Sequence, residues 1–204
     1  MTSSFPRTRL VVLLTLLLVW CGCDELARPA ADAVKPRVIT EPTRHDTDDP
    51  AIWVNPADPA KSLVLGTDKD TDGALYVYDL DGKIVKAVTG LARPNNVDVA
   101  YGFVLGEAKV DIAVVTERER QRLRVFRLPE MESIDGGDLV VFGGDVTRAP
   151  MGVALYRRSN DGALFVFVSG KSGPTDGYLA QYRLASDASG KLALTRVREF
   201  GRYS

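Results

Sequence analysis

Cysteine and histidine are almost missing from this sequence of 204 residues. The two cysteines, Cys21 and Cys23, both lie near the amino terminus, and His45 is the only histidine. The chain after Cys23 therefore has no disulfide and no thiol nucleophile. With a single histidine we expect neither a histidine-based zinc site nor a serine-type triad or phosphohistidine chemistry. Any hydrolysis would depend on water activated by a metal ion or on a carboxylate.

Long hydrophobic runs are also missing, apart from residues 10–20. This run, LVVLLTLLLVW, follows two arginines and is too short to cross a bilayer comfortably, as in a secretory signal peptide. We therefore predict a signal in residues 1–23 and a secreted, periplasmic or extracellular protein. Gly22 before Cys23 also fits a lipoprotein signal. Anchoring to a membrane through a lipid on Cys23 thus stays open beside simple secretion.

A strong excess of charge of one sign is absent too. Without residues 1–22 the chain keeps 24 lysines and arginines and 27 aspartates and glutamates, a net charge of −3. Nothing in this balance suggests binding to nucleic acid. Any affinity for another polyanion must come from cations gathered at one place or from a bound metal ion.

No segment sustains the 3.6-residue apolar period of a helix over three turns. Residues 24–36, DELARPAADAVKP, are rich in alanine, proline and charge and read as a linker. We place the folded domain at residues 37–204. There, short runs of Val, Ile, Leu, Tyr and Phe alternate with Gly, Asp, Asn and Pro, which predicts an all-β fold.

The sequence does contain a repeat of about 50 residues. Residues 62–83, 110–132 and 163–191 each read as an apolar strand, a Thr or Ser with one further residue, a cation, a turn and a second strand. The cations are Lys69, Arg118 and Lys171, which are 49 and 53 residues apart. A repeat of this length built from four short strands is typical of the blades of a β-propeller.

Flanking apolar segments complete three four-stranded blades. The innermost strands are predicted at residues 51–54, 97–103 and 152–156, and the outer strands at residues 83–89, 139–142 and 192–200. Propellers close with about four to eight blades. We therefore expect the chain to be the N-terminal part of a protein about twice as long.

Equivalent positions of successive blades face the same end of a propeller, so Lys69, Arg118 and Lys171 are expected to converge. Convergent lysines and arginines at strand ends form a receptor for phosphate or carboxylate groups. The alternative is that these are solvated turn cations that only fix the strand ends. Recurrence at the same place in three repeats favours the receptor.

Acidic and amide side chains gather at the entry of the first two innermost strands. Asp48 and Asp49 precede a proline in the first blade, and Asn95, Asn96 and Asp98 occupy the equivalent place in the second. Such hard oxygen ligands suit Ca²⁺, which takes six to eight oxygens. The alternatives are a turn for the two asparagines and a turn or capping hydrogen bond for Asp98.

These motifs together resemble a known family. They resemble the motifs of the β-propeller phytases, the calcium-dependent alkaline phytases of bacteria, of the 3-phytase type. The segments that carry the resemblance are TDDPAIWVNP, GTDKDTDGALYVYDLDGK, NNVDVAYGF with VDIAVVTER, RAPMGVALY and the Lys171 segment before YLAQYRL. The resemblance covers residues 37–204 and about the first half of that family's six-bladed domain. It implies a full-length ring that acts as a monomer.

The resemblance also implies a function. In this family the residues matching Lys69, Arg118 and Lys171 hold substrate phosphates, and those matching Asp48 and Asp49 belong to the calcium-binding apparatus, with the NNVD strand close by. The expected activity is secreted, Ca²⁺-dependent hydrolysis of phytate, myo-inositol hexakisphosphate, to lower inositol phosphates. Calcium would bridge phosphates and supply the attacking water, with no covalent intermediate.

Two positions depart from the family pattern. Met151 stands where the best-known members have a tyrosine, and Ser172 where they have a glutamate, so a phosphate-contacting hydroxyl and an acid are absent. Two other functions therefore stay open. One is a non-catalytic propeller module that binds a ligand or partner at the cell surface. The other is a Ca²⁺-dependent propeller lactonase or esterase.

Overall fold

The computed structural model describes residues 33–202, and the folded unit within that range begins at Arg37. The described residues form twelve β-strands and three short 3-10 helices. The helices are η1 (Pro59–Lys61), η2 (Arg118–Arg120) and η3 (Phe142–Gly144). None of them is long and apolar enough to span a membrane. The predicted signal, its Cys23 and most of the predicted linker lie outside the described residues.

The strands form three antiparallel sheets of four strands, and within each sheet the strands pair in chain order. The first sheet contains β1 (Thr47–Trp53), β2 (Leu63–Asp68), β3 (Gly73–Tyr78) and β4 (Ile84–Leu91). The second contains β5 (Pro94–Leu105), β6 (Ala108–Glu117), β7 (Arg122–Leu128) and β8 (Glu132–Ser133). The third contains β9 (Pro150–Arg157), β10 (Leu164–Gly170), β11 (Asp176–Ser186) and β12 (Leu192–Arg202).

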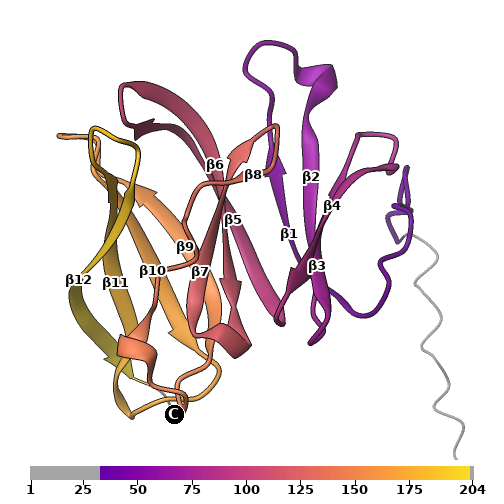
Figure 1. Cartoon of the computed structure of the whole chain (residues 1–204). Coiled ribbons are helices and arrows are strands. Elements are labelled where there is room, and N and C mark those ends of the chain that lie inside the picture. Colours follow the sequence, from indigo (N-terminus) through magenta and orange to yellow (C-terminus); the bar gives the residue numbers. More distant parts are fainter. Residues whose placement is uncertain (1–32, 203–204) are drawn as a thin grey trace, which may run out of the picture. The chain divides into compact units, whose positions relative to one another are not determined.

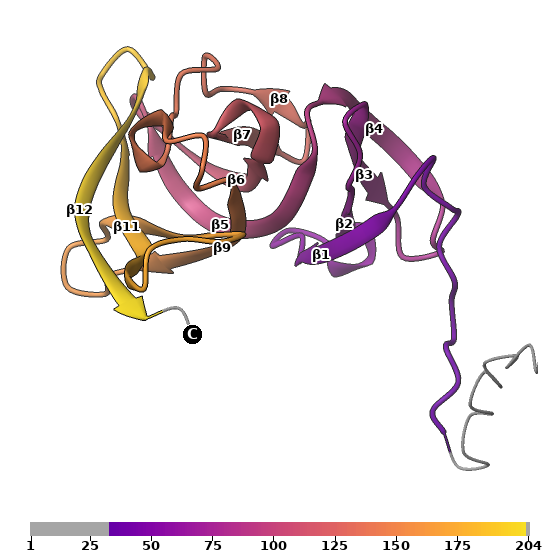
Figure 2. The same cartoon turned by 90° about the horizontal axis from the view of Figure 1, so that it is seen from below.

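The three sheets stand side by side in chain order, as blades of a propeller do (Figure 1). The first strand of the second sheet, β5, contacts both β1 and β9, the first strands of its neighbours. Figure 2, seen from below, shows the same order of the three sheets. The predicted all-β fold with three four-stranded blades is therefore confirmed, including β1, β5 and β9 as the innermost strands.

The core consists of two apolar layers, one between each pair of neighbouring blades. Strand β6 contributes to both layers, because successive side chains of a strand point to opposite faces. Ala113 and Val115 pack in the layer with Trp53 and Leu65 of the first blade. Ile112 and Val114 pack in the layer with residues of the third blade. This two-sided burial explains why the middle of β6 is a continuous apolar run.

The outer strand of the second blade was predicted at residues 139–142, and this was wrong. The fourth strand is the two-residue β8, which pairs with β7. The Asp135 carboxylate then accepts hydrogen bonds from the amides of Val125 and Gly137, which ends the pairing. Val140 forms an isolated bridge with Arg122, with backbone hydrogen bonds from Leu123 to Leu139 and from Val141 to Gln121, and the segment does not extend into a strand. The apolar residues Leu139, Val141 and Phe142 are instead buried in the layer against the third blade.

Hydroxyl groups near the end of the second strand of two blades tie the innermost strands together. Thr67 accepts a hydrogen bond from the amide of Asp49 (3.0 Å) and donates one to the carbonyl of Asn95 in the next blade (2.8 Å). Thr116 repeats both bonds, from the amide of Asn96 (3.0 Å) and to the carbonyl of Met151 (2.8 Å). The strand ends that carry the predicted site residues are thus held in a fixed register from blade to blade.

Candidate phosphate-binding site

Lys69, Arg118 and Lys171 occupy the same backbone position in their three blades. Each directly follows the second strand of its sheet, β2, β6 or β10. The amide of each donates a hydrogen bond to the carbonyl of the residue immediately before the first strand. The acceptors are Asp46 (2.7 Å), Arg93 (3.1 Å) and Ala149 (2.8 Å). The three cations therefore lie at equivalent places along one edge of the three sheets.

The Lys69 ammonium is held by two carboxylates of its own blade. Its Nζ lies 3.1 Å from Asp48 Oδ1 and 3.4 Å from Asp46 Oδ2. The hydrogen bond to Asp48 is the main cause that raises the pKa of Lys69. Lys69 is thus a fixed, charged donor whose charge is already balanced, so an incoming anion has to replace these partners.

The Arg118 guanidinium is far less well neutralised. Arg118 is 9% exposed, and its Nη1 donates a hydrogen bond to Asn95 Oδ1 (3.3 Å). Its Nε is buried without a partner, and among the described residues no carboxylate lies within ion-pair distance of it. Burial lowers the pKa of Arg118, and the neighbouring positive charge of Arg93 lowers it further. Such a site favours an anion, because a buried charge is costly unless it is paired.

Arg118 and Lys171 line one open cavity of about 380 Å³. The other lining residues are Arg93, Glu119, Gln121, Val146 and Ala149. Lys69 is not among them, but a chain of side-chain contacts links it to the cavity. It bonds Asp48, Asp48 accepts from Asn95 Nδ2 (2.7 Å), and Asn95 accepts from Arg118. The structure brings two of the three predicted cations to one cavity and places the third next to it.

Three of the five predicted calcium ligands lie together. Asn95 Nδ2 donates to Asp48 Oδ2 and to Asn96 Oδ1 (3.2 Å), so the three side chains meet beside Lys69 and Arg118. Asp48 is about a quarter exposed. Asp48 Oδ1 faces Lys69 and Asn95 Oδ1 faces Arg118, while the Asn96 oxygen is a further amide oxygen of this group.

The other two predicted ligands, Asp49 and Asp98, bind backbone amides instead. Asp49 Oδ2 accepts from the amide of Val97 in the second blade (3.0 Å). Asp98 Oδ2 accepts from the amide of Leu155 in the third blade (2.7 Å), and its Oδ1 from Val99 (2.7 Å). Both carboxylates therefore join neighbouring innermost strands and do not meet the Asp48 group.

Residues 33–202 contain no group of three histidine, cysteine or acidic side chains close enough to hold a metal ion. Because Ca²⁺ takes six to eight oxygens, Asp48 and Asn96 fit a calcium site only as contributors of single ligands. Calcium binding stays a prediction.

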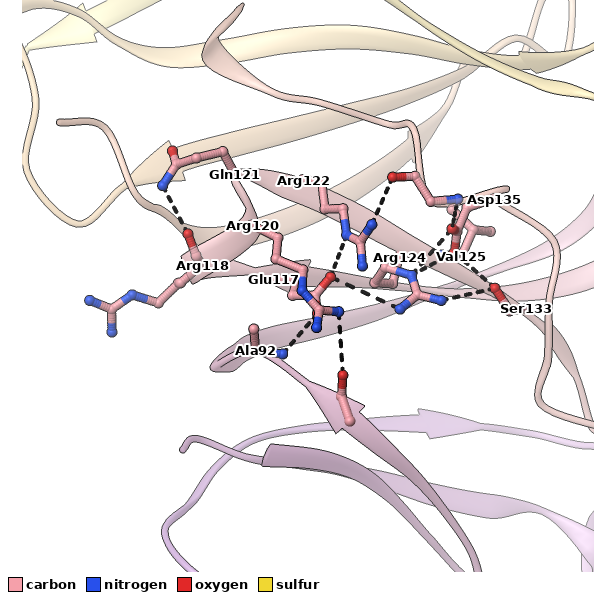
Figure 3. A network of polar contacts seen from close by, with 12 residues as sticks. Ala92, Glu117, Arg118, Arg120, Gln121, Arg122, Arg124, Val125, Ser133 and Asp135 are labelled. Atoms are coloured by element: carbon pink, nitrogen blue, oxygen red, sulfur yellow. Dashed lines mark hydrogen bonds and ion pairs between the residues drawn. The ribbon is translucent and has the colours of Figure 1, made fainter. Parts of the chain in front are cut away.

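The sequence did not single out Glu117, which is fully buried beside Arg118 (Figure 3). Its Oε1 accepts hydrogen bonds from the amide of Ala92 (2.8 Å) and from Arg120 Nη1 (3.0 Å). Its Oε2 accepts from Arg122 Nε and lies 4.0 Å from Arg124 Nη1. The run TERERQRLR signals many charges, but not that one acid would bind several of these arginines in the interior.

The two departures from the family pattern lie at the start and end of strands near the site. Met151 is the second residue of β9, and its carbonyl accepts the hydrogen bond of Thr116. Ser172 follows Lys171, and its exposed hydroxyl donates a long bond to the carbonyl of Thr147 (3.5 Å). Neither side chain supplies a carboxylate or a phenol to the cavity.

Comparison with known proteins finds a matching family model and similar curated proteins. A protein-family model described as Phytase matches residues 9–204. A protein of Bacillus subtilis (strain 168) named 3-phytase is 33% identical over 161 residues, which are 75% of this chain and 39% of that relative. The chain thus spans well under half the length of the relative.

Proposed function

Because the chain belongs to the phytase family, we propose that it takes part in the Ca²⁺-dependent hydrolysis of phosphate monoesters of phytate. The observation that carries this proposal is the equivalent placement of Lys69, Arg118 and Lys171 at one edge of the three blades. Phytate is a dense polyanion, and a chain with a small negative net charge needs gathered cations to bind it.

The two kinds of cation serve this substrate differently. The Arg118 guanidinium lines the cavity and offers a fork of N–H donors, and this fork matches two oxygens of one phosphate group. Lys69 acts as a point charge, and a phosphate oxygen can take the place of Asp48 or Asp46 on its Nζ. Release of Asp48 from Lys69 frees a carboxylate oxygen at the same edge.

We propose that calcium binds at this edge with Asp48 and Asn96 as the contributing residues of this chain. The ion would supply charge neutralisation at phosphate and activation of water. Asp49 and Asp98 join the innermost strands, so we expect them to support this site through the backbone. Export from the cytoplasm, by the signal predicted in residues 1–23, is part of the same proposal.

Phosphate release tests the proposed function directly. We expect the protein to release phosphate from phytate in the presence of Ca²⁺, and the rate to fall at least about 10-fold when a chelator removes the ion. The assay measures inorganic phosphate at matched ionic strength, with Mg²⁺ added back as the control for charge screening. Equal rates with Ca²⁺ and with chelator would contradict the calcium proposal. Tight binding of phytate without any release would favour the non-catalytic binding module.

A further inference from the structure

Arg93, which the repeat did not mark, lies against Arg118 with its backbone fixed. Its φ of 59° is left-handed, which is uncommon for a residue other than glycine. Its amide donates to the carbonyls of Asp70 (2.8 Å) and Leu91 (3.1 Å), and its own carbonyl accepts the amide of Arg118. These three bonds hold the unusual conformation and place the two arginines next to each other.

Buried Glu117 fixes the same turn from the other side. It accepts the amide of Ala92, the residue before Arg93, and the carbonyl of Ala92 accepts the amide of Glu119 (3.2 Å). Figure 3 shows that the side chain of Arg118 points away from the arginines gathered around Glu117. The Glu117 carboxylate therefore forms ion pairs with Arg120 and Arg122 and does not neutralise the positive charges of Arg93 and Arg118.

The cavity beside this turn has more positive than negative groups. Arg93, Arg118 and Lys171 line it together with one carboxylate, that of Glu119. Glu119 lies 4.0 Å from Arg93 Nη1, at the limit of an ion pair, and it also accepts the Thr71 hydroxyl (3.2 Å). Within residues 33–202, neither Arg118 nor Lys171 has an ion-pair partner, and the Nε atoms of both arginines are buried without a hydrogen-bond partner.

Two guanidinium groups brought together in this way repel each other unless an anion lies between them. Burial lowers the pKa of Arg118, and the charge of Arg93 lowers it further. A phosphate group has the charge to offset the repulsion and the oxygens to accept from the guanidinium groups of both residues that line the cavity. Glu119 alone cannot offset the repulsion, because its carboxylate lies 4.0 Å from Arg93 Nη1.

We propose that Arg93 is a further phosphate-binding residue, which with Arg118 and Lys171 holds one phosphate group of an inositol polyphosphate in this cavity. The inference rests on the proposed function and deepens it, since Lys69 beside the cavity is left to contact a different phosphate of the same molecule. Arg93 thereby favours substrates that carry several neighbouring phosphates over simple monophosphates.

Calorimetric titration of the full chain with phytate tests this role without relying on turnover. We expect Arg93→Gln to weaken binding about 10- to 100-fold, as the loss of one charge-assisted pair does. Arg93→Lys keeps the charge but loses the fork, and we expect an intermediate loss of about 3- to 10-fold. The matched control is Arg127→Gln. The exposed fraction of the Arg127 side chain is 38%, close to the 39% of Arg93, and Arg127 forms ion pairs with Glu130 and Glu132.

Arg127→Gln should change the affinity less than about twofold. The inference is overturned if Arg93→Gln, with an unchanged melting curve, binds phytate as tightly as the parent protein, or if the parent protein does not bind phytate. If Arg93→Gln does not fold, the affinity of Arg93→Lys for phytate tests the inference instead. An affinity of Arg93→Lys equal to that of the parent protein overturns bidentate binding of phosphate by Arg93. Binding that depends on Arg93 without phosphate release would contradict the proposed activity and leave this inference standing.

Discussion

Replacing Arg118 by alanine is expected to lower kcat/KM for phytate by about 100- to 1000-fold, the effect of removing one donor aimed at the charge of a transition state. Arg118 is buried, and its Nε has no partner within the protein. Its removal therefore deletes a largely buried cation that lines the cavity. The measurement is the rate of phosphate release at several phytate concentrations.

Two controls make this result specific. Arg118→Lys should recover part of the activity, because it restores the charge without the fork. Arg127→Ala removes an arginine elsewhere on the molecule and should leave kcat/KM within about twofold. A loss smaller than about fivefold in Arg118→Ala would show that Arg118 does not contact the reacting phosphate. If the protein were a lactonase that binds no polyanion, Lys69→Ala and Arg118→Ala would leave its ester hydrolysis unchanged.

Replacing Glu117 by glutamine is expected to lower the free energy of unfolding by about 3–5 kcal/mol, the cost of removing one partner from a buried ion pair. The Glu117 side chain has no exposed surface and contacts Arg120, Arg122 and Arg124. Glutamine keeps the size but leaves Arg120 and Arg122 without their carboxylate, while Arg124 keeps its ion pair with Asp135. Urea denaturation followed by circular dichroism measures the change.

The matched control is Glu130→Gln. Glu130 is 53% exposed and pairs with Arg127 at 3.3 Å, and an exposed pair contributes at most about 1 kcal/mol. We expect Glu117→Gln also to weaken phytate binding, because Glu117 fixes the turn that carries Arg93. A loss of stability below about 1 kcal/mol in Glu117→Gln would contradict a central role for the buried carboxylate.

The sequence was sufficient for the blades because strand pattern and repeat are local signals. Strand β6 reads as an apolar run since both of its faces are buried, and the recurring cations mark the end of the second strand of each blade, where their amides form equivalent backbone bonds. The outer strand of the second blade could not be found in this way. Leu139 and Val141 are apolar because they are buried between two blades. The residues of such a segment have the same apolar pattern as a short strand, so the local sequence does not distinguish the two.

The site was predicted less completely, because partners come from other blades. Asp48, Asp49 and Asp98 look alike as acids at strand entries, yet Asp49 and Asp98 bind backbone amides of the next blade, and Asp48 binds Lys69 and Asn95. Arg93 lies outside the repeat, and its importance appears only when its turn is packed against Arg118. These distinctions depend on which amide or cation the fold places opposite each carboxylate.

Cations at equivalent positions of the three blades are predicted to bind a polyphosphate. Calorimetric titration with phytate tests this prediction most directly on the triple variant Lys69→Ala, Arg118→Ala, Lys171→Ala. Its control replaces Lys61, Lys109 and Lys191 by alanine, three exposed lysines near the opposite ends of the strands. We predict that the first variant binds phytate at least about 1000-fold more weakly than the parent protein and that the control stays within about threefold. Equal affinities of the two folded triple variants would show that these three cations do not bind the polyphosphate.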